Sequence, residues 1–181
     1  MKYSFLIFII FFFLFSCENS KARKPIVRKT SSFMKESVLF NKNLNLAEEK
    51  TFKELIKLDA TNTYITSPNG FWYKAKQRDL VRYLPKFGDQ ITYTYEVYDL
   101  DYKVIYSSEE IGEQLYVVDQ QEIVEGLRNG LKLMGEGDIF TFLFPSHKVF
   151  GYLGDQKKIA VNQPLIYKVQ LNKIKKKNES N

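Results

Sequence analysis

Apolar and polar residues alternate along several segments of the chain, and a period of two residues predicts β-strands. The clearest segment is residues 91–97, in which one face carries Ile91, Tyr93, Tyr95 and Val97 while the other face carries threonine and glutamate. A second segment, residues 164–174, places Leu165, Tyr167, Val169 and Leu171 on a single face. Further strands are expected around residues 103–107, 114–118 and 138–145.

The segment from Tyr64 to Gln77 predicts a β-hairpin. Two β-prone runs flank Ser67-Pro68-Asn69-Gly70, in which proline fixes φ and Asn-Gly tolerates the backbone of a tight turn.

Upstream of the strands, residues 45–59 have the spacing of an amphipathic helix, with Phe52, Leu55 and Ile56 on one face. Asn45 is suited to cap its first turn, with Glu48 completing a pair like a capping box. The apolar face of this helix is expected to pack on the domain or, alternatively, to contact a partner.

A second short helix, from Glu125 to about Met134, contains two glycines. Each glycine inside a helix costs roughly 1 kcal/mol relative to alanine. Gly126, Gly130 and Met134 recur every four residues and therefore lie on one stripe of the helix. This stripe predicts a close approach to a sheet behind the helix or to a ligand in front of it.

Together these elements predict an α+β domain with one short helix against an antiparallel sheet of five or six strands. The expected organisation is a signal peptide (1–16), a flexible tether (17–44), an amphipathic helix (45–60), the folded domain (61–175) and a basic polar tail (176–181).

The first residues predict export. Lys2 precedes an apolar run of thirteen residues, which as a helix would rise only about 20 Å, less than the roughly 30 Å of a bilayer core. A cleaved signal peptide is therefore favoured over a membrane-spanning helix. The end of the run, Leu14-Phe15-Ser16-Cys17, resembles the bacterial lipoprotein box, which implies cleavage before Cys17 and lipidation of that residue. Cys17 is the only cysteine, so a disulfide within the chain is impossible.

The formal net charge of +6 is concentrated at residues 21–29 and 173–177, near the ends of the mature chain. A basic stripe along a folded face, which nucleic-acid binding would need, is not visible in the pattern. We expect no nucleic-acid partner, weak attraction of both ends to anionic lipid, a monomer, and an anchored protein that faces the periplasm.

Few residues could carry acid–base or metal chemistry. His147 is the single histidine and is expected on the surface, and no nucleophile elbow, phosphate-binding loop or metal motif occurs. The acidic pairs Glu48-Glu49 and Glu109-Glu110 are expected to be solvated. No cofactor or metal is predicted, and what remains is an interior rich in aromatic residues.

Three further stretches carry a resemblance to a known family. The stretch "EIVEGLRNGLKLMGEGDIFTFLFP", then Phe150-Gly151, then "NQPLIYKVQL", resembles the second half of an FKBP-type peptidyl-prolyl cis-trans isomerase. "GDQITYTYEVYD" with "VIYSS" resembles the first half. With the lipoprotein signal, the chain is most similar to the gliding-motility-associated isomerase lipoproteins. The resemblance implies a curved sheet wrapped around the glycine-containing helix, with the glycines packed on the sheet.

The resemblance also implies a set of pocket residues. Those implied to act directly on the substrate are Tyr95, Ile123, Val124, Leu127, Phe150 and Tyr167. Those implied to complete the pocket are Ile105, Tyr106, Tyr116 and Ile159. The chain departs from the family pattern where Tyr106 replaces an aspartate, Phe150 a tyrosine and Leu127 a tryptophan.

Two functions follow as alternatives. In the first, the protein isomerises X-Pro bonds in proline-containing segments of exported proteins, because a dry pocket favours the twisted amide over the more dipolar planar one. In the second, it is a weakly active or inactive FKBP-like module that binds such segments as a chaperone or as part of an envelope assembly.

Overall fold

The computed structural model describes residues 30–76 and 82–179. The chain divides into two compact units, Met1–Val38 and Leu39–Asn181, and the strands and the short helices all belong to the second unit. The predicted signal peptide, Cys17 and residues 18–29 lie outside the described residues.

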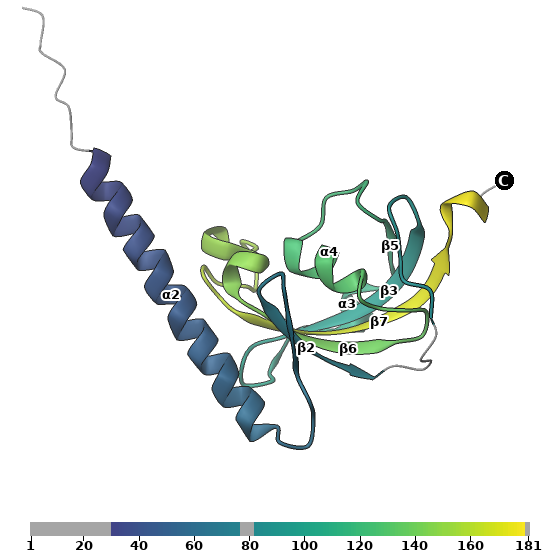
Figure 1. The fold of residues 1–181 in the computed structure, drawn as a ribbon, viewed down its shortest axis with the longest axis horizontal. Coiled ribbons are helices and arrows are strands. Elements are labelled where there is room, and N and C mark those ends of the chain that lie inside the picture. Colours follow the sequence, from purple (N-terminus) through teal and green to yellow (C-terminus); the bar gives the residue numbers. More distant parts are fainter. Residues whose placement is uncertain (1–29, 77–81, 180–181) are drawn as a thin grey trace, which may run out of the picture. The chain divides into compact units, whose positions relative to one another are not determined.

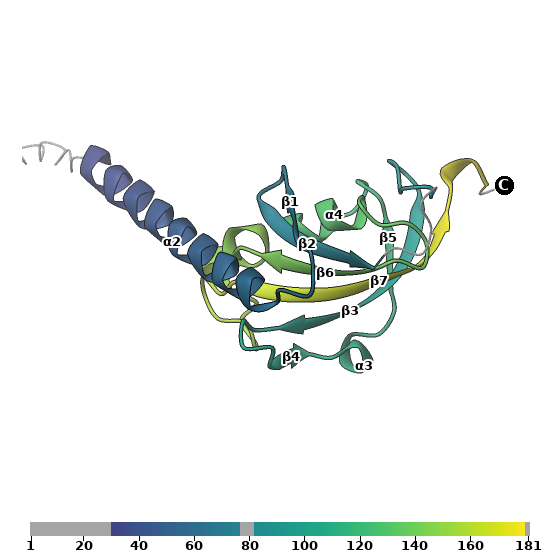
Figure 2. The same cartoon turned by 60° about the horizontal axis from the view of Figure 1, so that its bottom comes forward.

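Seven antiparallel strands form one sheet in the order β1-β2-β6-β7-β3-β4, and β5 pairs with β3 (Figure 2). The strands are β1 (Ile65–Ser67), β2 (Phe71–Lys76), β3 (Gln90–Tyr98), β4 (Val104–Tyr106), β5 (Gln114–Val117), β6 (Ile139–Phe144) and β7 (Leu165–Lys175). The α+β fold is as predicted. The sheet has seven strands instead of five or six because the β1–β2 hairpin joins it through β6.

The central strands β3 and β7 pair over nearly their full length, with Tyr95 opposite Val169 and Val97 opposite Tyr167. The predicted alternation is confirmed on both strands. Ile91 and Val97 are buried, as are all four predicted inward residues of β7, whereas Thr92 and Glu96 are only partly covered. The buried side chains point to the face of the sheet that carries the helix α4 (Glu125–Leu131).

Helix α4 lies against the sheet (Figure 1), and its two glycines, Gly126 and Gly130, make the close approach. A Cβ atom on Gly126 would lie 2.7 Å from Cδ1 of Phe144, and one on Gly130 would lie 2.9 Å from Cε1 of Phe142. Both phenylalanines belong to β6, are fully buried and stack with their ring centroids 5.2 Å apart. The glycine stripe therefore serves packing against the sheet.

The N-terminal helix α2 runs from Thr30 to Leu58. It begins fifteen residues before the predicted start at Asn45, so the prediction of a flexible tether up to residue 44 is wrong for residues 30–44. The segment has little apolar periodicity and mixes good helix formers such as Met34, Glu36 and Leu39 with poorer ones, but helix formation propagates readily once a turn exists. Phe52 is fully buried on Leu143 and Ile166, which confirms that this end of α2 packs on the domain.

Glu48 corrects a second prediction. It neither caps a helix nor lies on a solvated face. Its side chain is only 5% exposed and accepts hydrogen bonds from the backbone N and the Oγ of Ser146, at 2.9 and 2.6 Å. Glu49 is partly exposed and pairs with Lys53, one helical turn away. Glu48 thus connects α2 to the loop after β6, across 98 positions of sequence.

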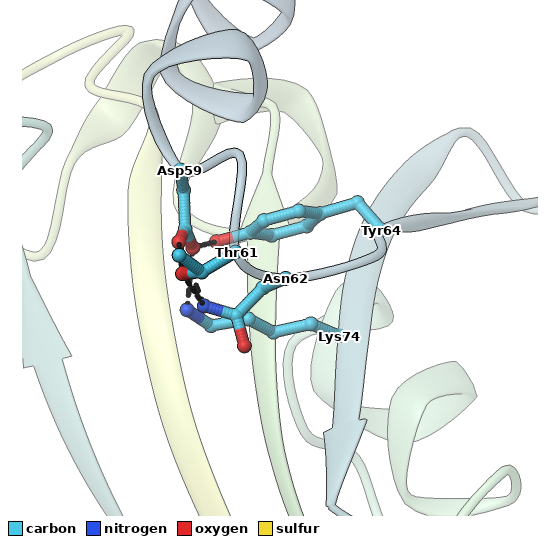
Figure 3. Close-up of polar contacts among 5 residues, drawn as sticks. All are labelled: Asp59, Thr61, Asn62, Tyr64 and Lys74. Carbon is cyan, nitrogen blue, oxygen red and sulfur yellow. Dashed lines mark hydrogen bonds and ion pairs between the residues drawn. The ribbon is translucent and has the colours of Figure 1, made fainter.

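A polar cluster fixes the C-terminal end of α2 to the hairpin (Figure 3). The carboxylate of Asp59 accepts hydrogen bonds from Lys74 Nζ (2.7 Å), Asn62 Nδ2 (2.7 Å) and the Tyr64 hydroxyl (3.0 Å). Gly70 closes the hairpin turn with φ of +78°, donating its N–H to the carbonyl of Ser67. The predicted turn at residues 67–70 is confirmed.

We expect Asp59→Asn to lower the free energy of unfolding at pH 7 by about 1 kcal/mol. The hydrogen bonds from Lys74 and Asn62 lower the pKa of Asp59 from 3.8 to about 2. Because the folded-state pKa is depressed, this stability is present above pH 4 and is lost as the pH falls through 2. The expected loss of about 1 kcal/mol is smaller than the free energy that the pKa shift alone would give, because water screens a carboxylate that is 22% exposed. Urea unfolding of both proteins between pH 2 and 7 measures it. If the difference in free energy of unfolding between the wild type and Asp59→Asn stayed constant from pH 2 to 7, ionised Asp59 would not be the stabilising group.

The remaining elements are short. They are α3 (Ser108–Ile111) and the 3₁₀ helices η2 (Ser146–Lys148), η3 (Gly151–Leu153) and η4 (Lys177–Glu179). In the last of these, the backbone N of Lys177 donates to Asp89, which is buried. Among the helices of the described residues, none is both long enough and apolar enough to cross a membrane.

Candidate functional site

All ten predicted pocket residues meet in one apolar cluster on the α4 face of the sheet. We call these ten residues the pocket cluster. They come from separate elements: Tyr95 on β3, Ile105 and Tyr106 on β4, Tyr116 on β5, Ile123 and Val124 before α4, Leu127 on α4, Phe150 and Ile159 on loops, and Tyr167 on β7. The sheet and α4 thus gather residues that lie up to 72 positions apart in sequence.

Stacked tyrosines form the centre of the cluster. The rings of Tyr95 and Tyr167 lie 5.5 Å apart between centroids with an interplanar angle of 10°. Tyr93 also stacks on Tyr95, at 5.8 Å between centroids, and Phe144 meets Tyr167 edge to face at 5.4 Å. Offset stacking and edge-to-face contacts are favourable geometries for aromatic rings. This arrangement holds Tyr95 as a rigid wall that remains partly exposed.

Exposure divides the pocket cluster into two groups. Tyr116, Leu127, Ile159 and Tyr167 are buried, whereas the other six are only partly covered. The six residues that water can still reach are Tyr95, Ile105, Tyr106, Ile123, Val124 and Phe150. These six residues are the members of the pocket cluster that keep surface for contact with a ligand.

The tyrosines of the pocket cluster are not suited to proton transfer at neutral pH. Burial raises the pKa of Tyr95 and of Tyr167 above the ordinary value. The hydroxyl of Tyr116, also with a raised pKa because of burial, accepts a hydrogen bond from the backbone N of Asp119. These rings offer apolar surface and neutral hydroxyl groups.

Tyr106, where the resemblance implied an aspartate, lies on β4 and contacts a carboxylate from a loop. Its hydroxyl donates to Asp155, which also accepts from the backbone N of Lys157 (2.9 Å) and of Ile159 (2.8 Å). Lys158 lies over the Tyr106 ring at 4.6 Å and pairs with Glu110 at 2.6 Å. These contacts attach the loop that carries Ile159 to β4. Asp155 could not be singled out from the sequence, because its partner is 49 positions away.

The Tyr106–Asp155 bond changes the ionisation of both groups. The hydrogen bond to Asp155 and burial together raise the pKa of Tyr106 to about 12. Burial raises the pKa of Asp155, but the hydrogen bonds from Tyr106, Ile159 and Lys157 outweigh it, and the pKa lies below the ordinary value. Asp155 is therefore an anionic anchor for the loop at neutral pH.

We expect Tyr106→Phe to raise the pKa of Asp155 toward 3.8 and to lower the free energy of unfolding by about 1 kcal/mol, the usual net value of one hydrogen bond. Hydrogen exchange at the amide of Ile159 should accelerate. NMR titration of the Asp155 carboxyl carbon measures the first effect. Tyr152→Phe is the matched control, since Tyr152 is 76% exposed on a neighbouring loop. An unchanged Asp155 pKa in Tyr106→Phe would refute the role of the hydroxyl.

The single histidine and the acidic pair Glu109-Glu110 are not members of the pocket cluster. His147 is exposed on η2, as predicted, and partial desolvation of its ring together with the nearby Lys148 lowers its pKa. In residues 30–76 and 82–179 no group of three His, Cys, Asp or Glu side chains is arranged to hold a metal ion. Glu109 and Glu110 are exposed, which confirms that prediction.

Comparisons with known proteins agree with this geometry. A family model for FKBP-type peptidyl-prolyl cis-trans isomerases matches residues 82–172. No curated protein matches the sequence of the chain.

Two solved structures share the fold. A peptidyl-prolyl cis-trans isomerase from Pseudomonas syringae pv. tomato is 16% identical, with a TM-score of 0.59 over 75% of this chain and 96% of that chain. FkpA from Escherichia coli is 20% identical, with a TM-score of 0.60 over 98% of this chain and 83% of that chain. At these identities the likeness shows the fold alone.

The family match spans about half of the chain and includes all ten residues of the pocket cluster. The chain therefore belongs to the FKBP-type peptidyl-prolyl cis-trans isomerases, enzymes that rotate the peptide bond preceding proline.

Proposed function

We propose that the pocket cluster is the substrate site of this isomerase and that the enzyme acts in the cell envelope on exported proteins. The observation that carries the site assignment is the meeting of ten apolar and aromatic residues, from strands, helix and loops, in one cluster that remains partly open.

Isomerisation of an X-Pro bond does not require an acid, a base or a nucleophile in the site. Rotation about an X-Pro bond crosses a barrier of about 18–20 kcal/mol because amide resonance is lost, and no proton has to move. The planar amide is more dipolar than the twisted one, so water stabilises the planar form more. An apolar site removes part of that preference, which is differential stabilisation of the transition state.

Each part of the pocket cluster has a proposed task. Tyr95 and Tyr167 form the aromatic walls against which the proline ring and the twisted amide lie. Ile123, Val124 and Leu127 form the floor at the start of α4. Phe150 and the Ile159 loop cover the opposite side, and the Tyr106–Asp155 bond keeps that loop in place.

The proposed place of action rests on the start of the chain. Lys2, the apolar run and Ser16-Cys17 support export and lipidation. Two or more acyl chains would hold the protein at a membrane almost permanently. The clients would then be newly exported proteins whose X-Pro bonds isomerise slowly, in tens of seconds unaided. Proteins of a gliding-motility apparatus are among the proposed clients.

Lipid attachment is tested by labelling cells that express the full chain with radioactive palmitate. The wild type should carry label and sediment with membranes, and Cys17→Ser should do neither. Unlabelled wild-type protein in the periplasmic supernatant would contradict the anchor. Protease added to spheroplasts should degrade the chain if it faces the periplasm, and full protection would contradict that orientation.

The client class is tested by refolding. An exported protein whose refolding is limited by proline isomerisation should refold faster with catalytic amounts of the enzyme, and the faster phase should be absent with Tyr95→Ala. In the native organism, loss of gliding on deletion, restored by the wild type and not by Tyr95→Ala, would support the motility role. Normal gliding after deletion would contradict it.

One observation favours a slower catalyst that mainly holds peptides. The Tyr106 hydroxyl is engaged by Asp155, and Phe150 has no hydroxyl, so the pocket cluster offers few polar groups to a substrate. Each missing hydrogen bond would remove on the order of 1 kcal/mol of ligand binding. Tight peptide binding with little rate acceleration would identify this alternative.

A further inference from the structure

A groove runs alongside the pocket cluster, between helix α2 and the loop that follows β6. One wall is formed by Asn41, Leu44 and Asn45 of α2, and the other by Ser146, His147, residues 149–152 and Asn162. Its volume is about 480 Å³, within the range of roughly 300–1,000 Å³ that ligand sites occupy. The groove residues are distinct from the pocket cluster except for one side chain.

That shared side chain is Phe150. It packs against the apolar core with the rest of the pocket cluster, and it also lines the groove. A polypeptide whose proline lies in the pocket cluster would therefore pass Phe150 directly into the groove. Phe150 therefore belongs to both surfaces.

Buried hydrogen bonds hold the two walls of the groove together. Glu48 lies one turn after Leu44 on α2, and its carboxylate accepts two hydrogen bonds from Ser146, which lines the opposite wall. Phe52, one further turn along, is fully buried on the domain. A carboxylate removed from water and bonded in this way fixes geometry. The two walls of the groove are therefore held at a fixed separation on the domain surface.

The lining indicates what the groove can bind. Leu44, Val149 and Phe150 offer apolar contacts. The side-chain amides of Asn41, Asn45 and Asn162 make no hydrogen bond within the described part of the chain, so they are free to pair with backbone N–H and C=O groups. The only titratable lining side chains are His147 and Tyr152. An uncharged, extended polypeptide matches these groups.

We infer that this groove binds the segment of the substrate polypeptide that flanks the isomerised proline, and that it selects uncharged, apolar sequences there. The inference rests on the proposed function of the pocket cluster. It assigns to α2 a direct role in substrate selection, with Asn41, Leu44 and Asn45 as specificity-determining residues.

The test compares short and long substrates on the full chain in detergent. One peptide has four residues around a Leu-Pro bond, and two longer peptides add four uncharged residues before or after that core. We expect kcat/KM to be about tenfold higher for one of the longer peptides, which corresponds to about 1.4 kcal/mol. Equal values for all three peptides would overturn the proposal.

Asn45→Arg and Asn43→Arg are the matched variants. Both residues are exposed on α2, but only Asn45 lines the groove. Asn45→Arg should abolish most of the gain from peptide length without changing kcat/KM for the short peptide, and Asn43→Arg should keep the full gain. Equal behaviour of the two variants would overturn the proposal. So would a dimer in solution that Asn45→Arg alone dissociates, because the groove would then hold a second copy of the chain.

A direct binding measurement separates this proposal from the proposed isomerase site. If no peptide is isomerised, fluorescence anisotropy of the labelled peptides still reports occupancy of the groove. Tighter binding of a long peptide to the wild type and Asn43→Arg than to Asn45→Arg would support the groove even then. Equal binding to all three proteins would overturn it.

Discussion

Replacing Tyr95 with alanine should lower kcat/KM for X-Pro isomerisation by at least about tenfold, which is a loss of 1.4 kcal/mol or more of transition-state stabilisation. Tyr95 stacks on Tyr167 at 5.5 Å and is the partly exposed wall of the pocket cluster. Removal of its ring admits water to the place where the twisted amide should be stabilised. The effect should be in kcat as well as in KM, because the proposed interaction is stronger in the transition state.

Tyr95→Phe separates the ring from the hydroxyl. If the aromatic wall is what matters, this variant should keep most of the activity, because the hydroxyl is neutral at working pH and transfers no proton. Far-ultraviolet circular dichroism and urea unfolding check that both variants remain folded. Wild-type kcat/KM in a folded Tyr95→Ala would contradict the assignment of this wall to the site.

Gly126→Ala should destabilise the domain by about 2 kcal/mol. Its Cβ would lie 2.7 and 2.9 Å from two ring atoms of Phe144 and 3.1 Å from the carbonyl oxygen of Lys148, a backbone atom. Overpacking of this kind lowers the free energy of unfolding by roughly 1–3 kcal/mol. The better helix propensity of alanine offsets at most about 1 kcal/mol of that loss. The ring cannot turn aside easily, because it is fully buried between Phe71 and Phe142.

Gly130→Ala should also destabilise the domain, by about 1–2 kcal/mol, since the three atoms nearest its new Cβ all belong to the ring of Phe142, the closest at 2.9 Å. Asn129→Ala on the same helix is the matched control, because Asn129 is only half-buried and alanine there improves helix propensity without overpacking. Urea unfolding gives all three free energies. Equal or greater stability of Gly126→Ala would show that α4 does not lie as close to β6 as described.

The sheet and the short helix could be predicted because their determinants are local in sequence. Alternation fixes which face of β3 and β7 is buried, and the glycine stripe of α4 indicates a close approach on one side. Whether that approach was to a sheet or to a ligand could not be decided from spacing, since both need a missing side chain. The contacts of Gly126 and Gly130 with Phe144 and Phe142 decide it.

The features that were missed depend on partners far away in sequence. An acidic pair such as Glu48-Glu49 is typical of a solvent-exposed helix face. Glu48 is buried instead because Ser146, in the loop after β6, donates hydrogen bonds to its carboxylate. Asp155 likewise becomes part of the site through Tyr106. The early start of α2 was missed for a different reason, because residues 30–44 lack an apolar period although they are compatible with a helix.

The resemblance implied an aspartate at position 106, where this chain has a tyrosine. A carboxylate is still present beside the pocket cluster, but it comes from Asp155 on the loop and the tyrosine comes from β4. The polar pair therefore serves loop attachment, and the other polar side-chain groups of the pocket cluster are the neutral hydroxyls of Tyr95, Tyr116 and Tyr167. An apolar site is what the proposed mechanism requires, since the catalyst supplies low polarity instead of a proton.

The measurement that tests the central claim most directly is a cis-to-trans isomerisation assay on the chain from residue 18 onward, with short Leu-Pro and Phe-Pro peptides. We predict acceleration above the uncatalysed rate that is proportional to enzyme concentration and is largely lost in both Tyr95→Ala and Ile123→Ala. No acceleration by a protein shown to be folded, or acceleration that both variants retain in full, would contradict the claim that the pocket cluster is an isomerase site.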